Sequence, residues 1–277
     1  MMDTSSLVWM YCIGTPAAAR AALRTPGLEP DAPPTVVDLA SESSGAPSRA
    51  TLAAVVSLVS RADYDEVALG QRMRDLDWVA DRGVAHDRIV ERCFAAGPTV
   101  PLRFGTLFAS VARVESLLAR DYEHFARLLA RLEGKAEWAL AVHADARRIE
   151  GRAAERARQA TSAAPTPMAS GPGRAYLEAK RAAAQARSTA HEHLPRWVDE
   201  IHARHAGAAV AAVAHPIPEG HTLLHRAAFL VPRDGEAAFL AASEAEARRV
   251  APEGLRLRLT GPWPPYSFAS APLGGVE

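Results

Sequence analysis

The sequence predicts an α+β protein of two domains, and three observations support this fold class. The chain has 277 residues, which is more than one typical hydrophobic core takes up. Hydrophobic residues make up 48% and charged residues 23%, which is the range of a soluble globular chain. Segments with strand character alternate with segments of helical period, as in helices packed on one face of a small sheet.

Three strands are predicted in the first half, at residues 7–13, 35–39 and 52–59. The first is rich in β-branched and aromatic residues and ends at the breaker Gly14-Thr15-Pro16. The third is a continuous apolar run, so a helix of the same residues stays open. A segment rich in Ser, Gly and Pro at 41–48 is predicted to be mobile.

The pattern turns helical from about residue 65 to 96, with a break expected at Gly83. A strand is then predicted at 99–108. It contains Pro101, which cannot donate a hydrogen bond to a sheet, so the strand is expected at an edge or a bulge. The apolar residues that predict the helical stripe are Val67, Met73, Leu76 and Val79.

The clearest predicted helix covers residues 111–132, where apolar residues step by three and four along one stripe. Ser110 is its expected N-cap and Gly134 its expected end. We therefore place a domain boundary close to Gly134. An N-terminal α+β domain covers residues 1–134, and a C-terminal domain covers 135–277.

The C-terminal half is predicted to combine strands with long helices. Pro195 is expected to kink or split the longest helix, and residues 206–215 fit either a helix or a strand. The chain closes with a tail of prolines and aromatics at 261–268. The other elements are a strand at 137–143, a helix to about 159, a mobile loop at 161–173, a helix at 174–205, a strand at 223–231, a helix at 236–250 and a strand at 255–259.

Charge and composition argue against several classes of protein. With 32 basic and 32 acidic residues, the chain has no net field to hold a polyanion, so nucleic acid is not expected as a partner. A locally basic section at 145–187 is expected to be a solvated helical surface, with the charge to meet an acidic partner. No run reaches the roughly 18 apolar residues of a membrane span, and the start lacks the basic residues of a signal peptide, so a cytoplasmic protein is expected.

Nothing in the sequence indicates a catalytic, metal or cofactor site. Phosphate-binding loops, dinucleotide fingerprints, nucleophile elbows and zinc-protease motifs are absent. Cys12 and Cys93 form no CxxC pair and are expected to be buried, reduced side chains. Four histidines are close in sequence but have no standard ligand spacing: His191, His193, His202 and His205.

Four short stretches carry a resemblance to a known family: 100–106 (VPLRFGT), 134–140 (GKAEWAL), 228–231 (AFLV) and 259–268 (LTGPWPPYSF). In this order and at these separations they resemble the GvpF/GvpL family of gas vesicle proteins. The resemblance implies a ferredoxin-like C-terminal domain and an accessory protein of gas vesicle assembly, associated with the vesicle, that is not an enzyme and needs no cofactor. Its implied partners are the small hydrophobic shell protein and other accessory proteins.

Candidate partner-binding residues come from the first and the last of these stretches. Arg103 and Phe104 lie in the first, and Arg103 either contacts a partner or forms a structural ion pair, for example with Glu137. The prolines hold the tail extended, so it either docks on the protein's own body or is a preformed ligand for a second protein. The tail candidates are Trp263, Pro264, Tyr266 and Phe268.

Two other functions stay open from the sequence. Ferredoxin-like domains often hold a pocket between sheet and helices, so a small-molecule-binding or enzymatic protein is the alternative hypothesis. The basic helices at 145–187 leave a nucleic-acid module as a third hypothesis.

Overall fold

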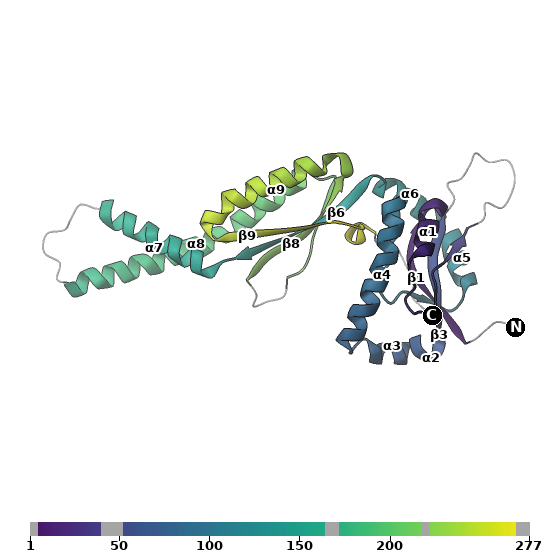
Figure 1. Cartoon of the computed structure of the whole chain (residues 1–277). Helices are drawn as coiled ribbons and strands as arrows, with labels where there is room; N and C mark the ends of the chain where they lie inside the picture. Colours follow the sequence, from purple (N-terminus) through teal and green to yellow (C-terminus); the bar gives the residue numbers. More distant parts are fainter. Residues whose placement is uncertain (1–4, 40–51, 164–171, 218–221, 270–277) are drawn as a thin grey trace. The chain divides into compact units, whose positions relative to one another are not determined.

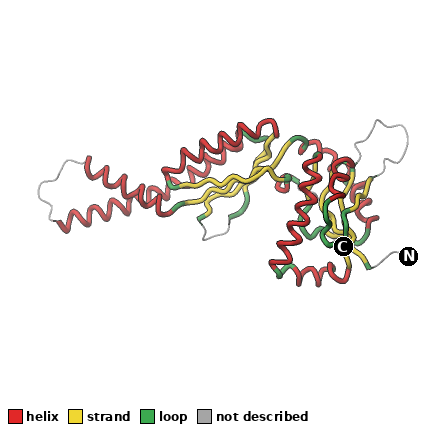
Figure 2. The backbone as a smooth tube through the Cα atoms, in the orientation of Figure 1, coloured by secondary structure: helices red, strands yellow, loops and turns green. Residues whose placement is uncertain are grey.

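The computed structural model describes residues 5–39, 52–163, 172–217 and 222–269, and it has the predicted α+β architecture with two separate sheets (Figures 1 and 2). The chain divides into two compact units. The first holds Met1–Glu137 together with Pro262–Glu277, and the second holds Trp138–Gly261. The expected division grouped the tail with the C-terminal domain. The chain instead returns to the first unit after Gly261, because the tail packs on residues of that unit.

The first unit is built on an antiparallel sheet in the order β2-β3-β1-β4, with a short β5 also paired to β1. A bulge lies in β1 where Met10 pairs with Val56 and Cys12 pairs with Val55. Nearly every side chain of β1 is buried, and since successive side chains point to opposite faces, both faces of the sheet must be covered there. The strands are β1 (Ser6–Gly14), β2 (Thr35–Asp38), β3 (Ala53–Ser60), β4 (Thr99–Pro101) and β5 (Leu107–Phe108).

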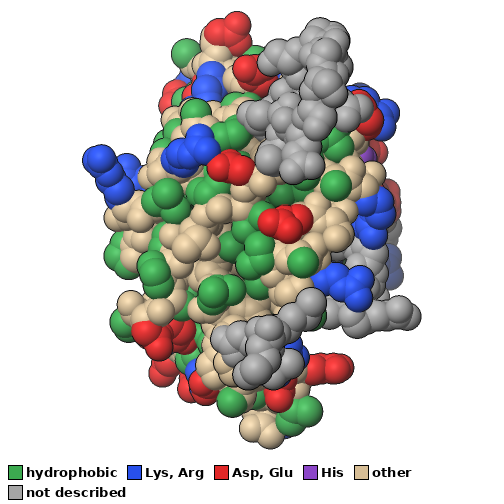
Figure 3. Space-filling view, turned by 90° about the vertical axis from the view of Figure 1, so that its right-hand side faces the viewer, with side chains coloured by type: hydrophobic (Ala, Val, Ile, Leu, Met, Phe, Trp, Pro, Cys, Tyr) green, Lys and Arg blue, Asp and Glu red, His purple; other side chains and the backbone are tan. Residues whose placement is uncertain are grey.

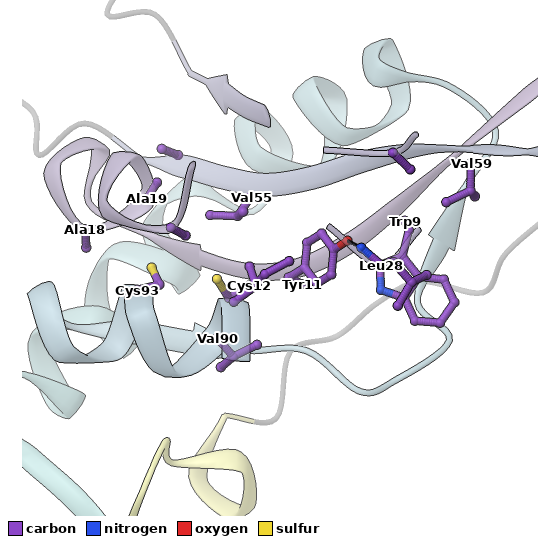
Figure 4. Close-up of a cluster of buried hydrophobic side chains, with 14 of the residues drawn as sticks. Trp9, Tyr11, Cys12, Ala18, Ala19, Leu28, Val55, Val59, Val90 and Cys93 are labelled. Carbon is purple, nitrogen blue, oxygen red and sulfur yellow. Dashed lines mark hydrogen bonds between the residues drawn. The ribbon is translucent and has the colours of Figure 1, made fainter. Parts of the chain in front are cut away.

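The described part of the first unit also holds six α-helices. Figure 4 shows part of its core between the sheet and α4, where Cys12 of β1 lies near Cys93, and Tyr11 and Trp9 follow further along the core. Both cysteines are buried, as expected. The helices are α1 (Pro16–Ala21), α2 (Arg61–Tyr64), α3 (Glu66–Arg72), α4 (Leu76–Ala96), α5 (Val111–Arg120) and α6 (Tyr122–Leu132).

Three predictions in this unit are corrected. Helix α4 continues through Gly83, and it begins where the Asp75 carboxylate accepts hydrogen bonds from the backbone N–H groups of residues 77 and 78. The helix expected at 111–132 is two helices, because the backbone leaves helical geometry at Asp121. The strand expected at 99–108 is split into β4 and β5, and Pro101 ends β4 at the edge of the sheet.

The second unit has the strand order β7-β8-β6-β9 and the element order β-α-β-β-α-β, counting α7 and α8 as one connection, which is the ferredoxin-like arrangement. Its core lies between the sheet and the helices α8 and α9. Residues 211–214, within the segment that fitted helix or strand, form β7. The elements are β6 (Lys135–Ala144), α7 (Ala146–Ala163), α8 (Pro172–Gly207), β7 (Ala211–Ala214), β8 (Leu223–Pro232), α9 (Glu236–Val250) and β9 (Leu255–Trp263).

The expectation was that Pro195 kinks or splits the long helix, and the split is wrong because α8 runs without interruption across Pro195. Much of the loop expected at 161–173, and all of the segment expected to be mobile at 41–48, lie outside the described residues. No helix in the described ranges combines the length and the apolar character that a membrane crossing requires.

Candidate partner-binding surface

The tail is docked on the first unit by specific hydrogen bonds. The Tyr266 hydroxyl donates to Asp87 Oδ1 of α4 at 2.8 Å. The backbone N–H and the hydroxyl of Ser267 donate to the two carboxylate oxygens of Glu137, each at 2.8 Å. Phe268, in a short 3-10 turn, is only 6% exposed. The tail therefore folds onto its own body.

The environment of Tyr266 keeps its phenol protonated. Burial is the main cause that raises its pKa above the ordinary value, and the Asp87 carboxylate adds to the effect because it repels a second negative charge. Tyr266 also packs against the hydrophobic core cluster of the first unit. A neutral hydroxyl that donates to a carboxylate is a strong, charge-assisted contact.

The four tail candidates have different surroundings. Pro264 and Phe268 are buried, and Tyr266 is partly buried. Trp263 is 43% exposed, which is unusual for so large an apolar side chain. Among the four candidates, Trp263 therefore has the most exposed side chain.

Arg103 and Phe104 lie on one loop between β4 and β5 but differ in burial, since Arg103 is exposed and Phe104 is partly buried. Backbone bonds from Leu102 to the Tyr11 carbonyl and from Met10 to the Thr106 carbonyl hold the two ends of this loop against β1. Gly105 has a φ of +88°, which permits the tight turn. Arg103 is exposed, and within the described residues its guanidinium forms no ion pair, so the pair expected with Glu137 is wrong.

Phe104 is part of a buried aromatic cluster. Its ring centroid lies 4.9 Å from that of Trp9, 5.9 Å from that of His86 and 6.2 Å from that of Trp78, all in edge-on arrangements. This residue was a candidate for partner binding, but its position makes it an anchor that holds the Arg103 loop in place.

His86 is the polar centre of that cluster. Its Nδ1 accepts from the Trp9 indole at 3.1 Å, so the other ring nitrogen carries the proton and donates to the Leu102 carbonyl at 3.1 Å. Burial lowers the pKa of His86 below its ordinary value. The neutral imidazole thus satisfies two buried groups and fixes the end of β4 to α4.

The outward face of α4 carries an exposed apolar stripe. Leu76 is 78% exposed and Val84 is 50% exposed, and Ala80 between them is exposed as well. Spacings of four place these three residues on one side of the helix, and Asp87, three residues further, continues the same side. The stripe therefore runs toward the turn of α4 on which Tyr266 is docked.

The inner side of the same helix is tightly held. Arg82 donates to both oxygens of Glu29, at 2.9 and 2.7 Å, and the Tyr64 hydroxyl donates to the same carboxylate. Burial is the main cause that raises the pKa of Tyr64, and the nearby Glu29 carboxylate raises it further. These contacts fix the first turns of α4 to α2 and to the loop before β2. The outward stripe is therefore part of a helix that is held in position.

Further exposed apolar side chains lie close to the start of this helix in the chain. They come from the end of β3, from α3 and from the turn before α4, which Figure 1 places together at one end of the first unit. The side chains are Leu58, Val67 and Met73. Figure 3 shows a different face of this unit, the one at the right-hand side of Figure 1, where hydrophobic side chains also lie between scattered charges.

This surface was not predicted from the sequence, because the predicted helix boundaries were wrong. Val67, Met73 and Leu76 were predicted to form one helical stripe, whereas they belong to α3, to a turn and to α4. The available signal was Asp75, a strong N-cap residue directly before Leu76. A new helix starting there places Leu76 and Val84 opposite the buried residues Ile89 and Cys93.

Comparison with known proteins gives one consistent result. Residues 7–270 match the family model described as gas vesicle synthesis protein GvpL/GvpF. Gas vesicle protein L of Streptomyces sp. (strain CB03234) is 31% identical over 229 residues, which cover 79% of this chain and 80% of that protein. Gas vesicle protein F of the same organism is 29% identical over 220 residues, covering 78% and 84%.

The fold has a counterpart among solved structures. The crystal structure of the gas vesicle protein GvpF from Anabaena sp. PCC7120 matches with a TM-score of 0.61 and 19% sequence identity, over 96% of this chain and 97% of that chain. At this identity the likeness is one of fold.

Proposed function

The chain belongs to the GvpL/GvpF family of gas vesicle synthesis proteins and so has a role in gas vesicle formation, and from this premise we propose that it is an accessory assembly protein that binds the small hydrophobic shell protein. The binding surface in this proposal is the outward face of α4, with Leu76, Ala80 and Val84. The protein acts there through contact and not through chemistry. Other gas vesicle accessory proteins are further partners in this proposal.

The observation that carries the proposal is the exposure of Leu76 and Val84 on a helix whose other side is pinned. An exposed apolar stripe at helical spacing is the pattern by which helices dock against apolar grooves or other helices. Full burial of a Leu or Val side chain contributes about 1.5–3 kcal/mol. A small hydrophobic partner protein would cover the exposed Leu76 and Val84 side chains and so remove them from water.

The other candidate residues have different roles in this proposal. Phe104, Pro264, Tyr266 and Phe268 support the surface from within, because they are buried, partly buried or hydrogen-bonded in the first unit. Arg103 and Trp263 are exposed and supply further contacts to the partner.

Co-purification tests the proposal. The small shell protein is co-expressed with a tagged wild-type chain, with the double variant Leu76→Gln/Val84→Gln, and with Leu177→Gln as the matched control. Leu177 is similarly exposed but lies on α8 in the second unit. Glutamine keeps the helix propensity and the approximate length of leucine.

We expect the wild type and the control to retain the shell protein and the double variant to lose most of it. Thermal unfolding of all three proteins checks that the chain stays folded. Equal retention by the folded double variant would move the interface away from α4.

A further inference from the structure

The second unit contains a cavity that the proposed function does not use. It lies where α7 and α8 meet the short 3-10 turn at Ala251–Glu253, and its volume is about 380 Å³. Ile149 and Leu194 contribute apolar side chains to its lining, and Trp197 contributes an aromatic ring. Its charged lining residues are Arg152, Arg156, Arg196, Glu200 and Glu253.

The guanidinium groups around this cavity outnumber the carboxylates. Glu253 is shared by two arginines, with Arg156 Nη2 at 2.7 Å from Oε2 and Arg152 Nη2 at 3.8 Å from Oε1. Glu200 is shared by Arg196 at 3.1 Å and by Arg249 at 3.7 Å. Arg249 lies outside the lining and also pairs with Glu246. The lining itself therefore has three guanidiniums and two carboxylates, an excess of one positive charge. Each guanidinium has five N–H donors, so donors remain for an added anion.

The aromatic wall is held in place by Arg249, which lies outside the lining. The guanidinium carbon of Arg249 lies 4.6 Å from the centre of the Trp197 ring, a cation–π contact. Gly254 follows the turn with a φ of +82°, and a side chain there would collide with Ile149 at 2.5 Å. The turn that carries Glu253 is therefore fitted closely against the start of α7.

The cavity is open to solvent at its charged side. The side chains of Arg152 and Arg156 are 45% and 48% exposed, and that of Arg196 is 78% exposed. Sites for small molecules bury most of the ligand surface. An open mouth lined by arginines suits a chain that places one side chain inside and continues outside.

We propose that this cavity binds an acidic peptide segment of a partner protein, with one apolar or aromatic side chain against Trp197 and neighbouring carboxylates on the arginines. Arg152 and Arg156 pair with these carboxylates in bidentate fashion. The inference does not depend on the proposed function, because its residues lie in the second unit and the α4 stripe lies in the first.

Fluorescence anisotropy on the full chain tests this inference. The probe is a fluorescein-labelled peptide of Asp and Glu with one central Phe. The test variants are Arg152→Gln/Arg156→Gln and Trp197→Ala. The control Arg256→Gln/Arg258→Gln removes the same charge from exposed positions on β9 of the same unit. Thermal unfolding checks that every variant is folded.

We expect the pocket double variant to weaken binding about tenfold or more, because charge-assisted hydrogen bonds are lost. The control should change the affinity about twofold or less, since exposed rim charges contribute little. Trp197→Ala should also weaken binding, and so should replacement of the peptide Phe by Ser. Equal weakening by the pocket and control pairs would overturn the inference in favour of unspecific charge attraction.

Two competitors identify the ligand class. ATP and inorganic phosphate carry the anionic groups without a peptide chain. We expect neither to displace the peptide at concentrations similar to its own. Binding of ATP in place of the peptide, sensitive to Arg152→Gln/Arg156→Gln, would overturn the peptide assignment and make the cavity a site for a small organic anion.

Discussion

The docked tail can be tested by comparing two aromatic residues that are only five positions apart in the chain. Phe268 is 6% exposed and Trp263 is 43% exposed. Truncation of a buried Phe to Ala costs about 3–5 kcal/mol, because the transfer energy is lost and a cavity is left. Trp263→Ala removes a side chain that already contacts water, so we expect a loss of about 1 kcal/mol or less.

The assay is thermal unfolding of the full chain, followed by circular dichroism. The first unit comprises residues 1–137 and 262–277, and for a unit of this size each kcal/mol shifts Tm by roughly 2–4 °C. Phe268→Ala should therefore lower the Tm of this unit by about 6 °C or more, and Trp263→Ala by about 4 °C or less. A shift for Phe268→Ala no larger than that for Trp263→Ala would refute the docking of the tail.

Three more predictions concern the packing of each unit. Burial lowers the pKa of His86 in the folded protein, so the unfolded chain binds more protons as the pH falls below about 6.5. The contribution of His86 to the free energy of unfolding should therefore be full above that pH and decrease as the pH drops. In urea unfolding, His86→Gln should show a weaker dependence of stability on pH than the wild type. Gly254→Ala should lower the Tm of the second unit, because a Cβ would meet Ile149 at 2.5 Å and φ is +82°; an unchanged Tm would contradict this geometry. Gly83→Ala should raise stability by about 0.5–1 kcal/mol in denaturant unfolding, because this position is helical and nothing lies near its added Cβ; destabilisation would restore the helix break predicted from the sequence.

Local patterns predicted the strands well. Residues 7–13 combine β-branched and aromatic side chains with a following breaker, and they form the central strand β1. The strict alternation at 255–259 is the start of β9. These patterns report a strand directly, because the residues that bury and the residues that pair are next to one another in the chain.

Helix continuity could not be predicted from single residues. Gly83 costs only about 1 kcal/mol in a helix, and the burial of Ile89, Val90 and Cys93 on the same helix outweighs it. Conversely, the apolar stripe at 111–132 continues across Asp121 although the backbone does not. An apolar stripe indicates which face of a helical segment is buried, but it does not indicate whether the segment is one continuous helix.

The site depends on contacts between distant residues. The partner of Ser267 is Glu137, which lies 130 positions away in the sequence. No local signal indicates that the tail returns to the first unit, or that Arg103 stays exposed. The outward direction of Leu76 and Val84 follows from the start of α4 at Asp75, which the periodicity alone did not locate.

Complementation of gas vesicle formation is the most direct test of the central claim, that this chain assembles vesicles through the outward face of α4. A strain lacking the protein is supplied with the wild type, Leu76→Gln/Val84→Gln or Leu177→Gln, all produced at equal levels, and vesicles are counted by electron microscopy. We predict that the wild type and Leu177→Gln restore vesicles and that the α4 double variant does not. Full restoration by the α4 double variant would contradict the account.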